Sequence, residues 1–163
     1  MLRRRGVQTL ELVVAIPVLL VVTLAIIEFG FLLALEESVV MAATEATREV
    51  TKIPGASLDM RRDVAVATAN RFLAPHQVQI VVSGIQETSN LRIDIQGDTR
   101  TANALVCNPK TGSPALLANE VRVTVCVRPT NAANLRPVPN WLRNLGFNLA
   151  GREVTASLVM PNE

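Results

Sequence analysis

The sequence is poor in the residue types that most often carry out chemistry. It contains one histidine, His76, two cysteines, no tyrosine and only 3% aromatic residues. The motifs G-x-S-x-G, G-x-G-x-x-G, H-E-x-x-H and the phosphate-binding loop are absent. Two thiolates and one histidine do not fill a tetrahedral zinc shell. We therefore expect no catalytic residue, no metal site and no cofactor, and we interpret His76 as a solvent-exposed or hydrogen-bonded residue.

Clustered charge is also scarce. The formal net charge is +2, from 16 basic and 14 acidic residues. Arg3, Arg4 and Arg5 stand together at the N-terminus, and the chain outside the N-terminal segment is nearly neutral. Binding to nucleic acid requires a clustered basic face, and single strands also require stacking aromatics. We therefore expect no nucleic-acid partner.

The sequence does contain a long apolar run. Sixteen consecutive uncharged residues lie between Glu11 and Glu28, and at a rise of about 1.5 Å each they span roughly 24 Å. This is short of the roughly 20 residues that a bilayer core requires. The apolar character resumes after Glu28, so a span from Leu12 to Leu35 is sufficient if Glu28 is masked.

The charges around the run predict its orientation. Arg3, Arg4 and Arg5 precede it, and two acids, Glu36 and Glu37, follow it. The positive-inside rule then places the N-terminus in the cytoplasm and exports the remainder of the chain. A cleaved secretory signal is the alternative, but the run is long and no small-x-small cleavage site follows it closely. The pattern favours a single-pass anchor.

Two helices are predicted. The first runs from Val7 to about Lys52, because the only helix breaker within it is Pro17, which a membrane segment tolerates. Pro54 and Gly55 then end it. Ser57 caps a second, amphipathic helix over residues 58–74.

The chain then changes to a period of two, which predicts strands over residues 77–82, 91–96, 121–127 and 154–160. Alternation of this kind is typical of an antiparallel sheet with one covered face. The predicted fold class is therefore α+β, with a long transmembrane and stalk helix, a second helix and a sheet of about four or five strands. We expect a helical segment over residues 7–52 and an exported α+β domain over residues 53–163.

Two further features concern the predicted domain. An even pair of cysteines in an exported domain, Cys107 and Cys126, indicates one disulfide, with two unpaired buried thiols as the alternative. Alternation along strand 121–127 places Cys126 on the solvent side. The long connector 128–152 contains a short predicted helix around Trp141, which we interpret as covering one end of the sheet in preference to forming a binding site.

The N-terminus resembles a type IV prepilin, because a basic leader and Gly6 are followed by four residues and then Glu11. The wider pattern RRGVQTLELVVAIP, IIEFGFLLA and AATEATREV resembles the TadE-like (TadE/TadG) family of pseudopilins from tight-adherence pilus systems, over residues 3–50. The resemblance implies a pilin-like fold and a leader over residues 1–6 that prepilin peptidase removes between Gly6 and Val7. It also assigns Glu11 as the family's acid, Pro17 as its intramembrane proline that kinks the helix, and Glu28-Phe29-Gly30 as its second signature.

Two departures from the main Flp pilins refine this expectation. Those pilins carry tyrosine after the acid and are much smaller, whereas Leu12 follows Glu11 here and a whole domain is attached. The resemblance therefore implies a minor pseudopilin in the bacterial inner membrane, with a periplasmic domain and no enzymatic activity. Its implied partners are membrane lipid, prepilin peptidase, other pilins and pseudopilins, and the assembly platform. The resemblance leaves open whether the fibre serves adhesion, secretion or DNA uptake. An unprocessed, anchored binding module is the alternative; an exported hydrolase lacks a recognised catalytic set.

The two acids of the apolar segment each have two interpretations. After cleavage, Glu11 could pair with the new α-amine of Val7 in a neighbouring subunit, so that both charges are buried only on stacking. Alternatively, it sits at headgroup level. Glu28, about 26 Å further along the helix, either contacts a partner helix or is hydrated near the outer interface, and the second position is slightly favoured.

Overall fold

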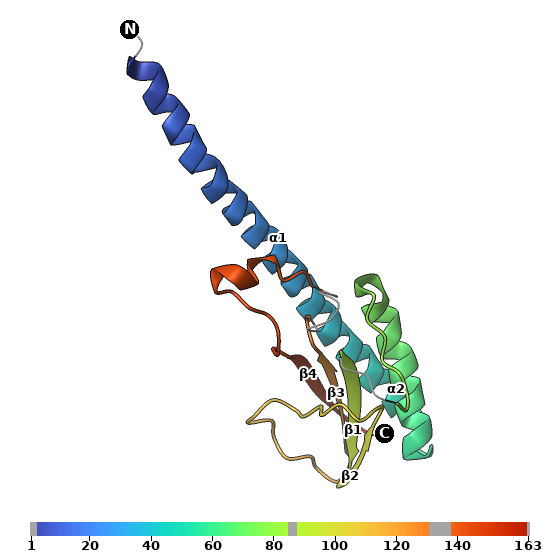
Figure 1. Ribbon diagram of the computed structural model, residues 1–163. Helices are drawn as coiled ribbons and strands as arrows, with labels where there is room; N and C mark the ends of the chain where they lie inside the picture. The colour runs from blue at the N-terminus through green and yellow to red at the C-terminus, as the bar shows by residue number, and fades with distance from the viewer. Residues whose placement is uncertain (1–2, 85–87, 131–137, 163) are drawn as a thin grey trace.

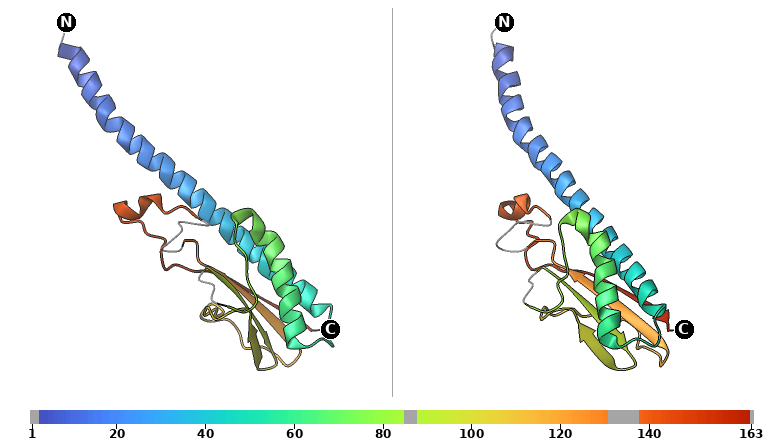
Figure 2. Two further views of the ribbon diagram at one scale, coloured as in Figure 1. Left: turned by 45° about the vertical axis from the view of Figure 1, so that its right-hand side comes forward. Right: turned by 90° about the vertical axis from the view of Figure 1, so that its right-hand side faces the viewer.

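A long helix, α1 (Arg3–Thr51), dominates the molecule. The computed structural model describes residues 3–84, 88–130 and 138–162, and for residues 3–10 it describes the backbone only. Pro17 lies inside α1 without ending it, and the helix curves along its N-terminal half (Figure 2). Within the described part of the chain, α1 is the one helix that is long and apolar enough to cross a membrane.

The two halves of α1 have different surroundings. The N-terminal half projects away from the rest of the molecule (Figure 1), and its side chains over residues 11–23 are exposed. The C-terminal half presents a fully buried face of residues three or four positions apart: Leu35, Val39, Ala42, Ala46 and Val50. This spacing places them on one side of a helix. One continuous helix is therefore exposed on all sides over residues 11–23 of its N-terminal half and forms part of the hydrophobic core in its C-terminal half.

The second helix, α2 (Leu58–Leu73), returns along the C-terminal half of α1 (Figure 2). The Ser57 side chain accepts a hydrogen bond from Met60 N at its start, which is the predicted cap. Ala65 and Ala69 are completely buried on α2, as Ala42 and Ala46 are on α1. Small side chains on both helices allow a close approach of the two backbones.

Four antiparallel strands form one sheet in the order β2-β1-β3-β4. They are β1 (Ser89–Ile95), β2 (Asp98–Thr101), β3 (Glu120–Val127) and β4 (Val154–Pro161). Helix α1 packs against β3 and β4, and α2 packs against β1 and β2. Leu91 pairs with Val125, and Ile93 with Val123, on the face that the helices cover. The expected α+β fold, with a long apolar helix, a second helix and an antiparallel sheet, is confirmed.

The predicted strand over residues 77–82 is wrong. A short 3-10 helix, η1 (Ala74–His76), follows α2, and Gln77 then turns the chain in the left-handed region at φ 57°. The side chain of Asn70 next occupies both backbone groups of Ile80: its Oδ1 accepts from Ile80 N at 2.7 Å and its Nδ2 donates to Ile80 O at 3.0 Å. An amide side chain thus takes the place that a neighbouring strand would have had.

Strand β2 was not predicted, because all four of its residues are exposed and carry no apolar alternation. Its position depends on the two-residue turn that joins it to β1. Gln96 and Gly97 both have positive φ, at 50° and 89°, which is the backbone of a type I′ hairpin turn. The turn therefore places Asp98 opposite Ile95.

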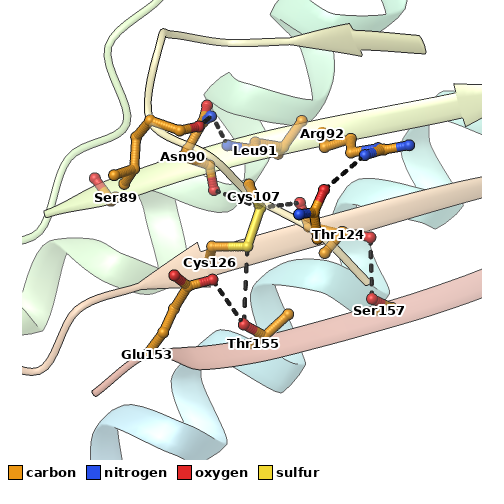
Figure 3. The surroundings of a disulfide bond; sticks show 12 residues. Ser89, Asn90, Leu91, Arg92, Cys107, Thr124, Cys126, Glu153, Thr155 and Ser157 are labelled. Carbon is orange, nitrogen blue, oxygen red and sulfur yellow. Dashed lines mark hydrogen bonds between the residues drawn. A yellow bond between two sulfur atoms is a disulfide. The ribbon is translucent and has the colours of Figure 1, made fainter. Parts of the chain in front are cut away.

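Cys126 lies on the outer sheet face that the alternation predicts, but it is not exposed to solvent. On this face, away from the helices, it lies next to Thr155 of β4 and is completely buried (Figure 3). Cys107 is bonded to it in a disulfide with 19 residues of sequence separation. Asn90 holds the covering segment in place, because its Oδ1 accepts from Asn103 N at 3.0 Å and its Nδ2 donates to the Leu105 carbonyl. The connector between β2 and β3 therefore covers part of the outer face.

Candidate functional site at the anchor and domain junction

Glu28 is the acid within the apolar run, and the chain itself buries it. Its side chain is 1% exposed. The Oε2 atom accepts a hydrogen bond from Leu142 N at 3.2 Å. Leu142 belongs to η2 (Trp141–Leu145), a short 3-10 helix in the connector before β4. The other oxygen, Oε1, has no hydrogen-bond partner among the described residues.

Residues 138–149 form the segment that covers Glu28, and we call this segment the clamp. Phe147 of the clamp packs on Phe29 of α1, with ring centroids 4.8 Å apart. Leu149 is 1% exposed in the main core. Asn140 fixes the shape of the clamp, since its Oδ1 accepts from Leu149 N at 3.3 Å and its Nδ2 donates to Asn148 Oδ1 at 2.8 Å. The clamp is thus internally bonded and attached to both α1 and the core.

The clamp supplies the condition that a span from Leu12 to Leu35 requires. A carboxylate within an apolar span is costly when it faces lipid. Here the backbone N–H of Leu142 donates a hydrogen bond to Glu28, and the clamp shields the Glu28 side chain from its surroundings. The hydrated position favoured from the sequence does not fit a side chain that is 1% exposed. A contact between Glu28 and a partner helix stays a prediction.

The other residues assigned from the resemblance lie away from the clamp. Glu11 is exposed on α1, on a shallow concave face that it shares with Val14, Val18 and Val22. Arg3, Arg4, Arg5, Gly6 and Val7 are in the helical backbone at the start of α1, and their side chains lie outside the described residues. The structure does not bring Glu11 and Glu28 together. Processing at Gly6, pairing by Glu11 and a kink at Pro17 remain predictions.

His76 makes a second tie between α1 and the domain. Its Nε2 lies 2.8 Å from Ser38 Oγ, and the Ser38 hydroxyl also bonds the Ala34 carbonyl at 3.0 Å. A hydroxyl has one proton, so when Ser38 donates to Ala34 O, His76 Nε2 donates to Ser38. This arrangement fits the interpretation of His76 as a hydrogen-bonded residue. Within the ranges that the structure describes, no group of three or more His, Cys, Asp or Glu side chains could hold a metal ion.

A groove runs between α1 and β4, which is an edge strand of the sheet. Glu36, Val40 and Thr44 line it on α1, and residues 154–158 line it on β4. Its volume is about 260 Å³, whereas pockets for small molecules usually hold about 300–1,000 Å³. The groove is therefore too small to favour a dedicated ligand site.

Residues 6–48 match the family model described as TadE-like protein. This part of the chain is similar to the TadE-like family. The resemblance predicted from the sequence is confirmed, and the match begins at Gly6 and includes Glu11, Pro17 and Glu28. No curated protein and no solved structure matches the chain.

The matched segment ends before the clamp. It covers α1 from Gly6 nearly to the end of the helix, so it includes Glu28 and Phe29 but none of the residues that contact them from the connector. Sequence reasoning placed a short helix near Trp141 but not its partner on α1. A usable signal was present, since the stretch NWLRNLGF gathers two of the chain's few aromatic residues and two leucines within eight residues. A masked acid in one apolar run requires such a cover elsewhere.

Proposed function

We propose that the protein is a minor pseudopilin, a membrane-anchored structural component in the biogenesis of a tight-adherence pilus or a related secretion fibre. The observation that carries this proposal is the division of α1. Its N-terminal half is an exposed apolar rod within a TadE-like segment, and its C-terminal half is the centre of a folded domain. Such a chain has an exposed helix that can pack against other subunits and a folded domain that offers a surface to partner proteins.

The exposed rod requires a partner outside the chain. Leu12, Val13, Leu19 and Ile26 are each more than half exposed, and a contiguous apolar surface of this kind marks a membrane or protein contact. In the inner membrane, lipid covers it while the N-terminus stays in the cytoplasm and the domain is periplasmic. In a fibre, the equivalent helices of other pilins or pseudopilins, placed by the assembly platform, cover it.

Glu11 supplies the register in this proposal. Cleavage by prepilin peptidase between Gly6 and Val7 creates an α-amine four residues before Glu11. The carboxylate then pairs with the amine of a neighbouring subunit, which makes a charge in an apolar helix favourable only in the assembled state. We expect Glu11→Gln to lower co-purification with pilin partners from membranes, and Glu37→Gln, at an exposed acid on the same helix, to leave it unchanged. Undiminished co-purification of the Glu11→Gln chain would remove the pairing.

The intact mass and N-terminal sequence of the chain recovered from its native membrane test the proposal. A chain that begins at Val7 is expected, and a Gly6→Leu variant should retain its leader. Gly30→Leu is the matched control, because Gly30 is exposed and a Cβ there meets no atom within 4 Å. An unprocessed native chain that still begins at Met1 would instead support the anchored binding module. A start well beyond residue 35 would identify a secretory signal and refute both.

A further inference from the structure

The clamp has a second face that is exposed among the residues that the structure describes. Leu142 donates its backbone N–H to Glu28 and is 6% exposed, whereas Trp141 and Leu145 on the same short helix are 48% and 65% exposed. Arg143, between them, is also exposed. Trp141 is the single tryptophan of the chain. The short helix η2 therefore exposes three side chains on its outer surface: the indole of Trp141, the guanidinium of Arg143 and the apolar side chain of Leu145.

The position of this turn along α1 is unusual. Figure 1 and both views of Figure 2 show η2, in orange-red, at the end of the domain nearest the projecting half of α1. Its contact with α1 is at Glu28, seven residues before the end of the apolar run at Leu35. At about 1.5 Å per residue, this contact lies roughly 10 Å inside the end of the run.

That depth decides what surrounds the outer face of η2. A span that ends near Leu35 leaves the level of Glu28 within the outer leaflet, close to the boundary between acyl chains and headgroups. Trp favours this boundary because its ring is apolar and its indole N–H can still reach water or a headgroup. An arginine side chain can extend its charged end toward phosphates while its stem stays in the apolar layer.

We propose that Trp141 and Leu145 insert into the outer leaflet of the membrane, with Arg143 among the lipid phosphates. The occupant of this surface is the phospholipid bilayer that α1 crosses, so the inference rests on the proposed membrane anchoring. The clamp then has two faces with separate roles: Leu142 masks Glu28 from lipid, and the opposite face contacts lipid itself. The chain contacts the bilayer at two places, a spanning helix and a shallow wedge beside it.

The chain is suited to a direct test, because Trp141 is its single tryptophan and it has no tyrosine. The full chain is reconstituted in vesicles of phosphatidylcholine and phosphatidylglycerol, with acyl chains brominated either near the glycerol or near the methyl end. Trp141 emission is compared with that of a control chain carrying Trp141→Phe and Leu117→Trp. Leu117 is 65% exposed and lies three residues before Glu120, the first residue of β3. Glu120 pairs with Pro161 at the end of β4, and this end of the sheet lies near the C-terminus, far from the projecting half of α1 (Figure 1).

We expect blue-shifted Trp141 emission that lipids brominated near the glycerol quench most, with little quenching by aqueous iodide. The Leu117→Trp control should show the reverse. Resistance of the chain to alkaline carbonate extraction is measured in the same vesicles. Carbonate-resistant chains with iodide-accessible, lipid-insensitive Trp141 would overturn the lipid contact and leave the anchor standing. Chains that carbonate extracts would overturn both the lipid contact and the anchored pseudopilin.

Discussion

The hydrogen bond between Glu28 and Leu142 predicts a local effect of Glu28→Ala. The Leu142 N–H is buried in η2 and its acceptor is Glu28 Oε2 at 3.2 Å. A hydrogen bond to a carboxylate contributes about 1.5–3 kcal/mol. Removing the acceptor should lower the free energy for opening the clamp by that amount. Since about 1.4 kcal/mol is a factor of ten, the Leu142 amide should exchange its hydrogen about 10- to 150-fold faster.

Hydrogen exchange of the full chain in lipid nanodiscs, followed by mass spectrometry of a peptide that covers the clamp, measures this effect. Global stability is a poor readout, because Glu28→Ala also removes a desolvated carboxyl group whose Oε1 has no partner among the described residues, and the two effects offset each other. Glu28→Gln keeps one acceptor oxygen and should fall between the native chain and Glu28→Ala. Glu37→Ala, at an exposed acid of the same helix, should change nothing.

Amides of β3 provide the internal reference for this experiment. They lie in the centre of the sheet, with β1 on one side and β4 on the other, so they should stay protected in every variant. Native-like protection of Leu142 in the Glu28→Ala chain, with β3 equally protected, would refute the clamp as described. It would mean that the contact of Phe147 with Phe29 and the burial of Leu149 hold the segment without the carboxyl group.

Two further predictions concern the domain. Replacing both Cys107 and Cys126 by serine opens a loop of 19 residues' separation and should lower the free energy of unfolding by about 3 kcal/mol; urea unfolding in detergent measures it, and a loss below about 1 kcal/mol would contradict the loop-closure argument. Ala46→Leu adds three carbon atoms at a completely buried position of α1 and should cost about 1–3 kcal/mol. Met41→Leu, at a position 46% exposed on the same helix, is its control, and equal stability of the two variants would show that the face around Ala46 is not close-packed.

The elements that sequence periodicity predicted are those whose burial is regular. Helix α1 was predicted nearly to its last residue, Thr51, because Pro17 is the only helix breaker within it. In the structure its buried positions recur every three or four residues. Strand β3 was predicted because Val121, Val123 and Val125 alternate with polar residues. In each of these elements one face packs in the hydrophobic core, and the apolar pattern follows from that geometry, although the outer face of β3 is buried as well.

The errors arose where one polar side chain or one turn decides the structure. Residues 77–82 are β-branched enough to suggest a strand, but Asn70 binds the backbone of Ile80 and removes it from any ladder. Strand β2 exists because Gln96 and Gly97 adopt positive φ, although its own residues are all exposed. Propensity averaged over a window does not contain either event.

The clamp was beyond prediction for another reason. Glu28 and Leu142 are separated by 114 residues. The donor is the backbone N–H of Leu142, which almost any residue type would supply, so the sequence does not indicate this hydrogen bond. What the sequence did contain was the requirement: an acid in an apolar run must be masked, paired or hydrated. It did not contain which of these three holds.

The buried acid Glu28 couples the orientation of the domain to the projecting half of α1. The core holds α1 from Leu35 onward, and the clamp holds it again at Glu28 and Phe29. The core contact, from Leu35 to Val50, fixes the C-terminal half of α1 in the domain, and the clamp extends this attachment toward the projecting half. Glu28 makes this attachment directional, because its hydrogen bond to Leu142 forms in only one rotational position of α1 relative to the clamp. A leucine at the same position would make contacts that depend less on this rotation. In the proposed fibre, subunits stack through the projecting half of α1, so the rotational setting of each domain follows from the register of its helix.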